Sequence, residues 1–345
     1  MTFGVIQRIC LILLLSAVAA RSATARQIEP WPREPESPQA SKPKEIPRAW
    51  RALIGEYGSE RDPFYVLERS GRLWIVQGRG NPQPVADTSS KVFLLDSKGR
   101  VTSVRIGSAT YDRRQVGPVD GSGQLRVEPL RPVSAVLKEA MAAEPPKESG
   151  ELRHAELVEL IKLDPTIRLD IRYASTNNFL GSVFYAEPRA FLERQAAEAL
   201  VRANAQLKKY GYGLLVHDGY RPWYVTKTFW DATPDDKKWL VADPSRGSRH
   251  NRGSAIDLTL YELKTRRAVE MPSTYDETTT RAYAFYPGGT DLQRWHRGLL
   301  RRVMESEGFT VNMQEWWHFD YKDWQRFAIG NLPFAGIRAA MQQFK

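Results

Sequence analysis

Six prolines lie between residues 30 and 47, at positions 30, 32, 35, 38, 43 and 47, among glutamate, lysine and serine. Proline fixes φ and has no amide N–H to donate, so a segment this rich in proline favours an extended conformation over a packed helix or strand. We therefore expect a Pro-rich tether over residues 26–47 and a folded part that starts near residue 48.

The N-terminal segment has the pattern of a targeting signal. Arg8 precedes an apolar stretch from Ile9 to Ala20, and Ala23-Thr-Ala25 forms a small-residue cleavage site. The stretch is too short to cross a bilayer as a helix and has the length of a signal-peptide core. We expect a signal peptide over residues 1–25 and an exported, periplasmic or extracellular protein. The only cysteine, Cys10, lies in this segment, which excludes disulfides, a thiolate nucleophile and cysteine-bound zinc in the exported chain.

Length and composition narrow the classes of protein to which the chain can belong. The chain has 345 residues, 42% of them hydrophobic and 26% charged, enough for one large domain or two smaller ones. After the signal segment no apolar run approaches the ~20 residues of a membrane helix, so we expect no membrane span once the signal is cleaved. The formal net charge is +10, but basic residues mix with acidic ones, as in Arg301, Arg302 and Glu305. This pattern predicts a solvated surface and no nucleic-acid partner.

Short apolar runs after the tether alternate with turn residues. Two β-hairpins are predicted, one from Phe64–Leu67 and Leu73–Val76 around Ser70-Gly71, the other from Lys91–Leu95 and Val101–Ile106 around Asp96–Gly99. We predict a small β domain over residues 48–130 and a linker over residues 131–150. The hairpins carry no histidine, and the linker suggests few contacts across the junction, so this domain should be dispensable for chemistry. The sequence indicates no partner for it.

Helical and strand patterns alternate after residue 150. A helix is predicted from Pro188 to Gly211, with Leu192, Ala196, Ala199, Ala203 and Leu207 on one face, and another from the N-cap Thr290 to Gly308. Strands are predicted at Leu214–Val216, Ser254–Leu260 and Trp316–Tyr321. The fold class is α+β, with a sheet covered by helices over residues 151–345.

One segment sets a histidine before a buried carboxylate. Gly253 permits a sharp turn into a strand in which Asp257 would point inward, where an uncompensated carboxylate costs several kcal/mol. A metal bound by His250, Asp257 and one further imidazole would compensate it, with the open three-ligand set of a catalytic zinc site. By itself the pattern also fits an exposed His250 and an arginine partner for Asp257.

Glu315-Trp-Trp-His318 adds a histidine and a second carboxylate. A spacing of three places the two side chains on opposite faces of a regular strand, so a turn or bulge is needed to bring both into one site. A carboxylate beside a zinc-bound water can take its proton and return it to the leaving amine of a peptide. Trp316 and Trp317 are interpreted as core aromatics.

Arg221 ends a predicted strand, and Pro222 begins a helix. An arginine fixed at this junction could neutralise the oxyanion that forms when water attacks a carbonyl. An isolated arginine of this kind would instead lie on the surface over Tyr220.

Three motifs carry a family resemblance: Asp218-Gly-Tyr-Arg-Pro222, then Ser248 to Leu260, then Glu315-Trp-Trp-His318. In this order they resemble the zinc D-alanyl-D-alanine dipeptidase family, the VanX type, and the similarity covers roughly residues 152–325. Tyr173 to Phe179 and Met271 to Asp276 also resemble its pattern. Residues 48–115 faintly resemble the β-rich domain appended to serine-β-lactamase-like hydrolases. The resemblance lies in the entry segment from Trp50 to Tyr57, and no function is carried over from it.

The resemblance implies the zinc D-Ala-D-Ala peptidase fold, a helix-covered, mostly antiparallel sheet, here preceded by a small all-β domain. It implies one Zn²⁺ per chain on His250, Asp257 and His318. Glu315 would be general base and acid, and Arg221 would stabilise the oxyanion. Ser248, Tyr173 and Asp276 would line the substrate pocket, with Asp276 facing the ammonium of the dipeptide.

Two features of the chain depart from the antibiotic-resistance enzymes of this family. The stretch between Arg221 and His250 is shorter than in the antibiotic-resistance enzymes, and the signal peptide and β domain are foreign to them. Export suggests dipeptide scavenging or turnover of cell-wall peptidoglycan.

Three alternatives stay open. The chain could be a zinc D,D-carboxypeptidase acting on peptidoglycan stem peptides, a non-catalytic wall-binding protein, or an Fe(II) protein, since two histidines and one carboxylate also bind that ion. A serine peptidase is disfavoured, because the only Ser-x-x-Lys, Ser41 to Lys44, lies in the tether.

Overall fold

The computed structural model describes residues 41–59, 61–77, 83–85, 91–116 and 125–337. The predicted signal peptide, over residues 1–25, and most of the predicted tether lie outside these residues. Among the described residues, no helix combines the length and the apolar character that crossing a bilayer requires.

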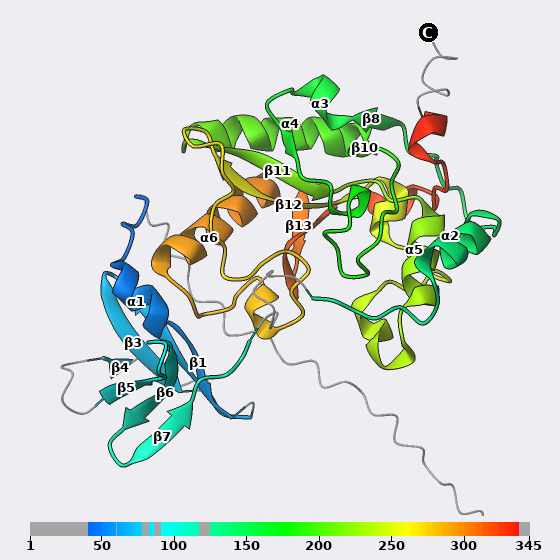
Figure 1. Cartoon of the computed structure of the whole chain (residues 1–345). Coiled ribbons are helices and arrows are strands. Elements are labelled where there is room, and N and C mark those ends of the chain that lie inside the picture. The colour runs from blue at the N-terminus through cyan, green and yellow to red at the C-terminus, as the bar shows by residue number, and fades with distance from the viewer. Residues whose placement is uncertain (1–40, 60, 78–82, 86–90, 117–124, 338–345) are drawn as a thin grey trace, which may run out of the picture.

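Two antiparallel sheets follow the short helix α1 (Arg48–Leu53) and, with it, form what we call the β unit (Figure 1). The first sheet contains β1 (Gly55–Gly58), β2 (Pro63–Arg69), β3 (Arg72–Gln77) and β4 (Gln83–Pro84), and the second contains β5 (Lys91–Leu95), β6 (Val101–Ile106) and β7 (Ala109–Asp112). Both predicted hairpins are confirmed as the pairs β2–β3 and β5–β6. Tyr57, Phe64 and Val104 belong to a small apolar core of this unit.

The prediction of a linker over residues 131–150 is wrong. This segment contains the helix α2 (Val133–Met141), whose Val133, Val136 and Ala140 are buried in the main core. Apolar residues at a spacing of three and four give α2 a face that packs into this core. At the end of the segment, Glu148 binds Arg252 and the amide of Ile329.

The main sheet has the order β13-β14-β12-β11-β9. Its strands are β13 (Phe309–Asn312), β14 (Glu315–Tyr321), β12 (Ala255–Glu262), β11 (Tyr212–Asp218) and β9 (Arg168–Leu169). All pairs are antiparallel except β9 with β11. A second, two-stranded antiparallel sheet joins β8 (Leu157–Glu159) and β10 (Phe191–Glu193). The chain is thus a mixed α and β protein with antiparallel sheets, as predicted.

Four helices accompany these sheets: α3 (Leu160–Leu163), α4 (Arg194–Lys208), α5 (Trp223–Ala232) and α6 (Asp291–Ser306). The predicted cap of α6 is confirmed, because Thr290 and Gln293 form a reciprocal capping box. The start of α4 was placed too early, at Pro188. Residues 191–193 instead form β10, and the side chain of Glu193 accepts hydrogen bonds from the first free amides of α4.

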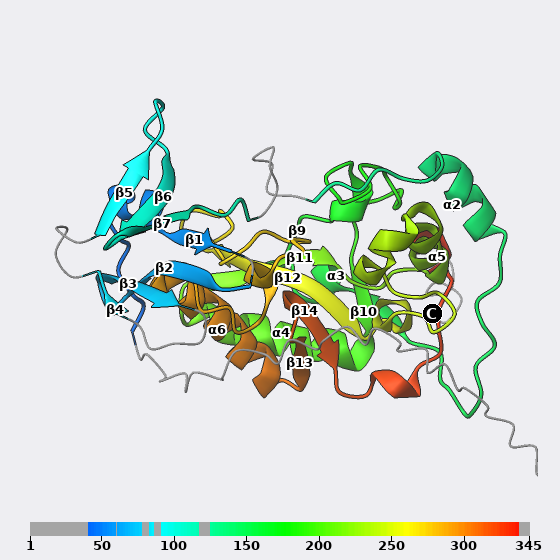
Figure 2. The ribbon, with the colours of Figure 1, turned by 90° about the horizontal axis from the view of Figure 1, so that it is seen from below.

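Polar contacts bind the β unit to the part of the chain that follows residue 125. The amide of Glu68 in β2 donates to the carbonyl of Gly289 at 3.1 Å, and its carboxylate accepts from the amide of Asp291 at 2.8 Å. Figure 2 shows β2 beside α6. The expectation of few contacts across the junction is therefore wrong, since it was read from the chain connection alone and these contacts come from residues more than 200 positions apart.

Candidate active site

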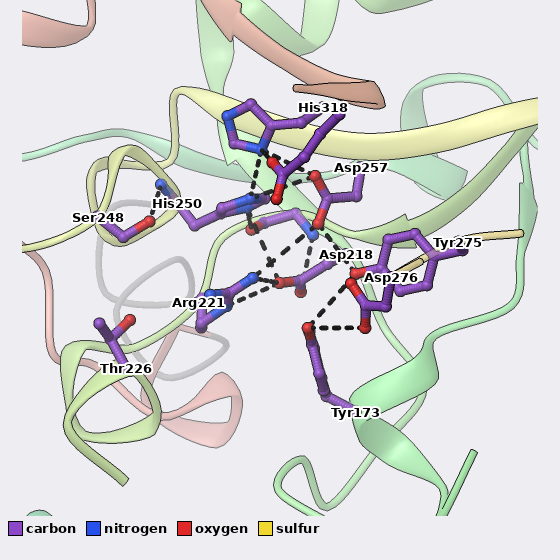
Figure 3. Close-up of polar contacts among 12 residues, drawn as sticks. Tyr173, Asp218, Arg221, Thr226, Ser248, His250, Asp257, Tyr275, Asp276 and His318 are labelled. Atoms are coloured by element: carbon purple, nitrogen blue, oxygen red, sulfur yellow. Dashed lines mark hydrogen bonds and ion pairs between the residues drawn. The ribbon is translucent and has the colours of Figure 1, made fainter. Parts of the chain in front are cut away.

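All of the predicted site residues meet in one cavity of about 760 Å³. They come from the two strands β12 and β14 and from four loops or short turns, and they are Tyr173, Arg221, Ser248, His250, Asp257, Asp276, Glu315 and His318. Figure 3 shows most of them around the same space.

His250 lies in a short 3₁₀ turn, Arg249–Arg252, that local sequence fixes at both ends. Ser248 caps its start, with its hydroxyl accepting from the amide of His250 at 3.3 Å. Gly253 ends it with φ 66°, a left-handed conformation that glycine adopts without steric cost. The Nδ1 atom of His250 donates to the carbonyl of Gly219 at 2.8 Å, which leaves Nε2 facing the cavity.

Strand register brings the next two residues together. Asp257 in β12 lies directly opposite His318 in β14, so both side chains project from the same face of the sheet. Asp257 is 4% exposed and accepts a hydrogen bond from the hydroxyl of Tyr275 at 3.0 Å. Burial acts to raise the pKa of Asp257, but His250 and His318 outweigh it and hold the pKa well below its usual range.

The bulge that the Glu315–His318 spacing requires is present. The pairing of β13 with β14 shifts between Val311 and Asn312, so that Asn312 lies opposite Glu315. The Asn312 amide donates to Glu315 at 2.9 Å and holds that carboxylate 3.9 Å from Nδ1 of His318. Burial raises the pKa of Glu315, which suits a group that must accept a proton.

Three donor atoms of this group converge closely enough to share one metal ion. Nδ1 of His318 is 2.9 Å from Oδ1 of Asp257, and Nε2 of His250 is 3.2 Å from the same His318 nitrogen. All three ligand atoms lie within 4.8 Å of one another. The other ring nitrogen of His318 contacts Asp320 at 3.0 Å, so each imidazole has an outer partner that directs a lone pair inward. Two imidazoles and one carboxylate fit zinc with an open position.

Arg221 is fixed next to these donors. Its guanidinium contacts Asp218 at 2.8 Å and 2.9 Å, and lies over the rings of Tyr173 and Phe229. One nitrogen is 4.0 Å from Asp257, so the positive charge lies at the edge of the donor group. The predicted surface alternative for Arg221 is wrong, because the side chain is buried.

Asp276 lines the same cavity, and its carboxylate lies beside Tyr173 and Tyr275 (Figure 3). Its carboxylate accepts from the hydroxyl of Tyr173 at 3.4 Å. Burial, followed by the charges of Asp257 and Glu315, raises the pKa of Asp276 to about 8. A ligand that brings a positive charge to Asp276 would remove this penalty.

Sequence reasoning missed three residues that hold the site. Asp218 accepts from Tyr185 and binds Arg221, Tyr275 donates to Asp257, and Asp320 binds His318. Asp218 and Tyr275 adjoin residues that the motifs singled out, and Asp320 stands two positions after His318 on the same face of β14, which is a signal that alternation alone could have given.

This arrangement defines a class of protein before any comparison is made. A group of three metal donors, with a carboxylate and a buried guanidinium beside it, can activate water, accept its proton and stabilise the resulting negative oxygen. These are the parts of a metal-dependent hydrolase.

Comparison with known proteins places the chain within that class. The sequence pattern of the D-Ala-D-Ala dipeptidase family matches residues 153–329. The chain is 33% identical over 165 residues to a D-alanyl-D-alanine dipeptidase of Escherichia coli (strain K12), covering 48% of this chain and 84% of that protein. It is 34% identical to the Enterococcus faecium dipeptidase and 30% identical to that of Streptomyces coelicolor, with 46% of this chain and 87% of each relative covered. The chain therefore belongs to the D-Ala-D-Ala dipeptidase family of zinc metallopeptidases.

Proposed function

We propose that this protein hydrolyses the dipeptide D-alanyl-D-alanine with one zinc ion held by His250, Asp257 and His318. The observation that carries the proposal is the half-buried Asp276, which lines the same cavity as the metal donors and Glu315. A small substrate with a free ammonium could place this positive charge beside Asp276, which needs a cationic partner. The same substrate would then place its peptide bond beside the metal donors. The relatives that share the matched region are named for this activity.

Zinc, when bound, would polarise the scissile carbonyl and the attacking water. Glu315 takes a proton from that water as its oxygen bonds to the carbonyl carbon, and passes the proton to the leaving amine as the C–N bond breaks. Arg221 stabilises the negative charge on the former carbonyl oxygen. Its ion pair with Asp218 keeps the guanidinium in place for this step.

Substrate contacts are proposed for three residues. Asp276 would bind the ammonium, and the Tyr173 hydroxyl, 3.4 Å away, would orient that carboxylate. Ser248 lines the cavity but uses its hydroxyl to cap the turn that carries His250. We infer that Ser248 supports substrate binding by holding that turn in place, in addition to any direct contact with the substrate.

The division of the chain and its place in the cell are also proposals. We propose a zinc dipeptidase domain that begins before α2, with a helix-covered sheet, and a preceding all-β domain. The apolar leader supports export, and an exported dipeptidase would serve scavenging or wall turnover.

Metal removal tests the proposal. Purified protein should contain about one zinc per chain, and D-Ala release from D-Ala-D-Ala should stop with a chelator and return with zinc. Stoichiometric iron without zinc, or hydrolysis that survives chelation, would overturn the assignment.

A further inference from the structure

The loop that carries Asp276 adopts an unusual backbone conformation. Asp276 has φ 59°, in the left-handed region that non-glycine residues seldom occupy. A residue in this region persists where neighbouring contacts hold it. The contacts that hold Asp276 therefore also determine where its carboxylate lies.

One guanidinium joins both sides of Asp276. The Nε and Nη2 atoms of Arg281 donate to the carbonyl of Pro272 at 3.1 Å and 3.0 Å, and Nε is 3.4 Å from the carboxylate of Glu277. Glu277 is 4% exposed and also accepts from Thr279 at 2.5 Å. Arg281 thus holds the loop before and immediately after Asp276.

The third donor of Arg281 leaves the loop. Its Nη1 atom donates at 3.1 Å to the carbonyl of Val116, in the segment that follows the β unit. Since the planar guanidinium holds its donors in a fixed fork, the position of Val116 and the position of the loop are coupled through one rigid group.

A second contact anchors the other end of the loop on the β unit. The hydroxyl of Tyr286 donates to Glu56 in β1 at 2.9 Å, and Arg114 binds the other oxygen of that carboxylate. The Tyr286 ring packs edge-on against Tyr65 in β2, with centroids 5.9 Å apart, and is 3% exposed. The loop between Pro272 and Tyr286 is therefore fixed to the β unit through Tyr286 and to the segment that follows the β unit through Arg281.

We propose that the β unit is a positioning element for the substrate-binding loop, acting on Asp276 through Arg281 and through the Glu56–Tyr286 contact. The inference rests on the proposed function, in which Asp276 binds the substrate ammonium. Arg281 and Tyr286 are positioning residues, because neither reaches the metal donors. Their loss should weaken substrate binding and selectivity and leave the metal chemistry intact.

The test compares Arg281→Gln and Tyr286→Phe with a matched control, Tyr57→Phe. The Tyr57 hydroxyl donates to Leu53 within the β unit, so the control loses a buried hydroxyl there without touching the loop. Arg281→Gln should raise KM for D-Ala-D-Ala about tenfold, as for one charge-assisted hydrogen bond lost, with kcat within about twofold and zinc content unchanged. The preference for the free dipeptide over its N-acylated form should shrink. Tyr286→Phe should move in the same direction by less, and Tyr57→Phe should not.

Hydrogen exchange gives a readout that does not depend on activity. Backbone amides of residues 273–282 should exchange faster in Arg281→Gln, and at the wild-type rate in Tyr57→Phe. If Arg281→Gln fails to fold, Arg281→Lys, which keeps the charge but lacks the fork, carries the same test. Unchanged exchange in this segment, or a folded variant with unchanged KM and preference, overturns the inference. Inactive wild-type protein would overturn the proposed function instead, and the exchange result would still decide this inference.

Discussion

Single side chains in this site depend on partners outside the motifs. The Nδ1 atom of His318 faces Asp257 and His250 because the other ring nitrogen binds Asp320, and Arg221 stays beside Asp257 because it pairs with Asp218. A motif residue supplies a functional group, and its partner sets the orientation and protonation of that group. Two predictions separate these contributions.

Glu315→Gln should remove proton transfer while zinc binding persists. The amide keeps the size of the side chain and can still accept from Asn312, but cannot take a proton from water. We expect kcat to fall by about 10² to 10⁴-fold. Metal analysis checks that zinc is retained, and steady-state kinetics check the loss of kcat. A kcat near the wild-type value would show that Glu315 is not the base.

Asp320→Asn should weaken zinc binding by about 10 to 100-fold, because His318 would lose its charged outer partner. Competition with a chromophoric chelator measures the affinity. Asp323→Asn is the control, since Asp323 lies three residues later and pairs with Arg326 outside the cavity. Equal affinities in the two variants would contradict a role for Asp320 in holding His318.

At the scale of elements, the site depends on where turns end and strands begin. Gly253 stops the His250 turn and starts β12, so that Asp257 arrives opposite His318. An added Cβ at Gly253 would meet a Leu157 methyl group at 2.6 Å and the amide nitrogen of Glu193 at 3.1 Å. The two small strands β8 and β10 therefore fix the approach of this turn.

Gly253→Ala should destabilise the protein more than Gly211→Ala. Both glycines have positive φ, which costs an alanine about 1–2 kcal/mol, but nothing lies within 4 Å of an added Cβ at Gly211. The difference between the two free energies of unfolding therefore measures the clash at Gly253. Denaturant titrations of both variants measure these free energies. Equal losses of stability would mean that β8 and β10 shift to accommodate the added methyl group without cost.

Elements with local signals could be predicted, and elements made by distant contacts could not. The hairpins β2–β3 and β5–β6, the capping box of α6 and the bulge in β14 follow from turn residues, cap residues and spacing. α2 was missed because it lies in the segment that was predicted to be a linker, and β10 because three residues give too short a pattern. Residue types and spacing indicated His250, Asp257, Glu315, His318 and Arg221. The family resemblance added Ser248, Tyr173 and Asp276, whereas the role of Tyr275 depends on a tertiary contact.

At the scale of the whole molecule, the buried contacts between distant segments determine stability. His296 in α6 accepts from the Tyr212 hydroxyl in β11 at 3.0 Å, and its Nδ1 faces the carbonyl of Glu270 at 3.3 Å. Burial, the largest cause, lowers the pKa of His296 to about 4. Neutral imidazole satisfies both contacts, so protonation opposes the folded state.

Stability should therefore fall as pH decreases from about 6.5 towards 4. In that window the unfolded chain binds a proton at His296 and the folded chain does not, so the free energy of unfolding decreases by about 3 kcal/mol. His296→Gln cannot titrate and should lack this component. Denaturant unfolding at pH 7 and pH 4.5 gives the change in the free energy of unfolding for wild type and for the variant. An equal decrease in both proteins would contradict the assignment to His296.

The central claim is that Asp276 selects a free ammonium beside the metal donors. Its most direct test is kcat/KM for D-Ala-D-Ala against N-acetyl-D-Ala-D-Ala, in wild type and in Asp276→Asn, which tolerates the left-handed backbone. An acylated substrate would cover this half-buried carboxylate without giving it a partner, so wild type should prefer the free dipeptide by about 10² or more, and the variant should lose most of this preference. Equal or faster release of D-Ala from the acylated peptide would contradict the claim and indicate a D,D-carboxypeptidase.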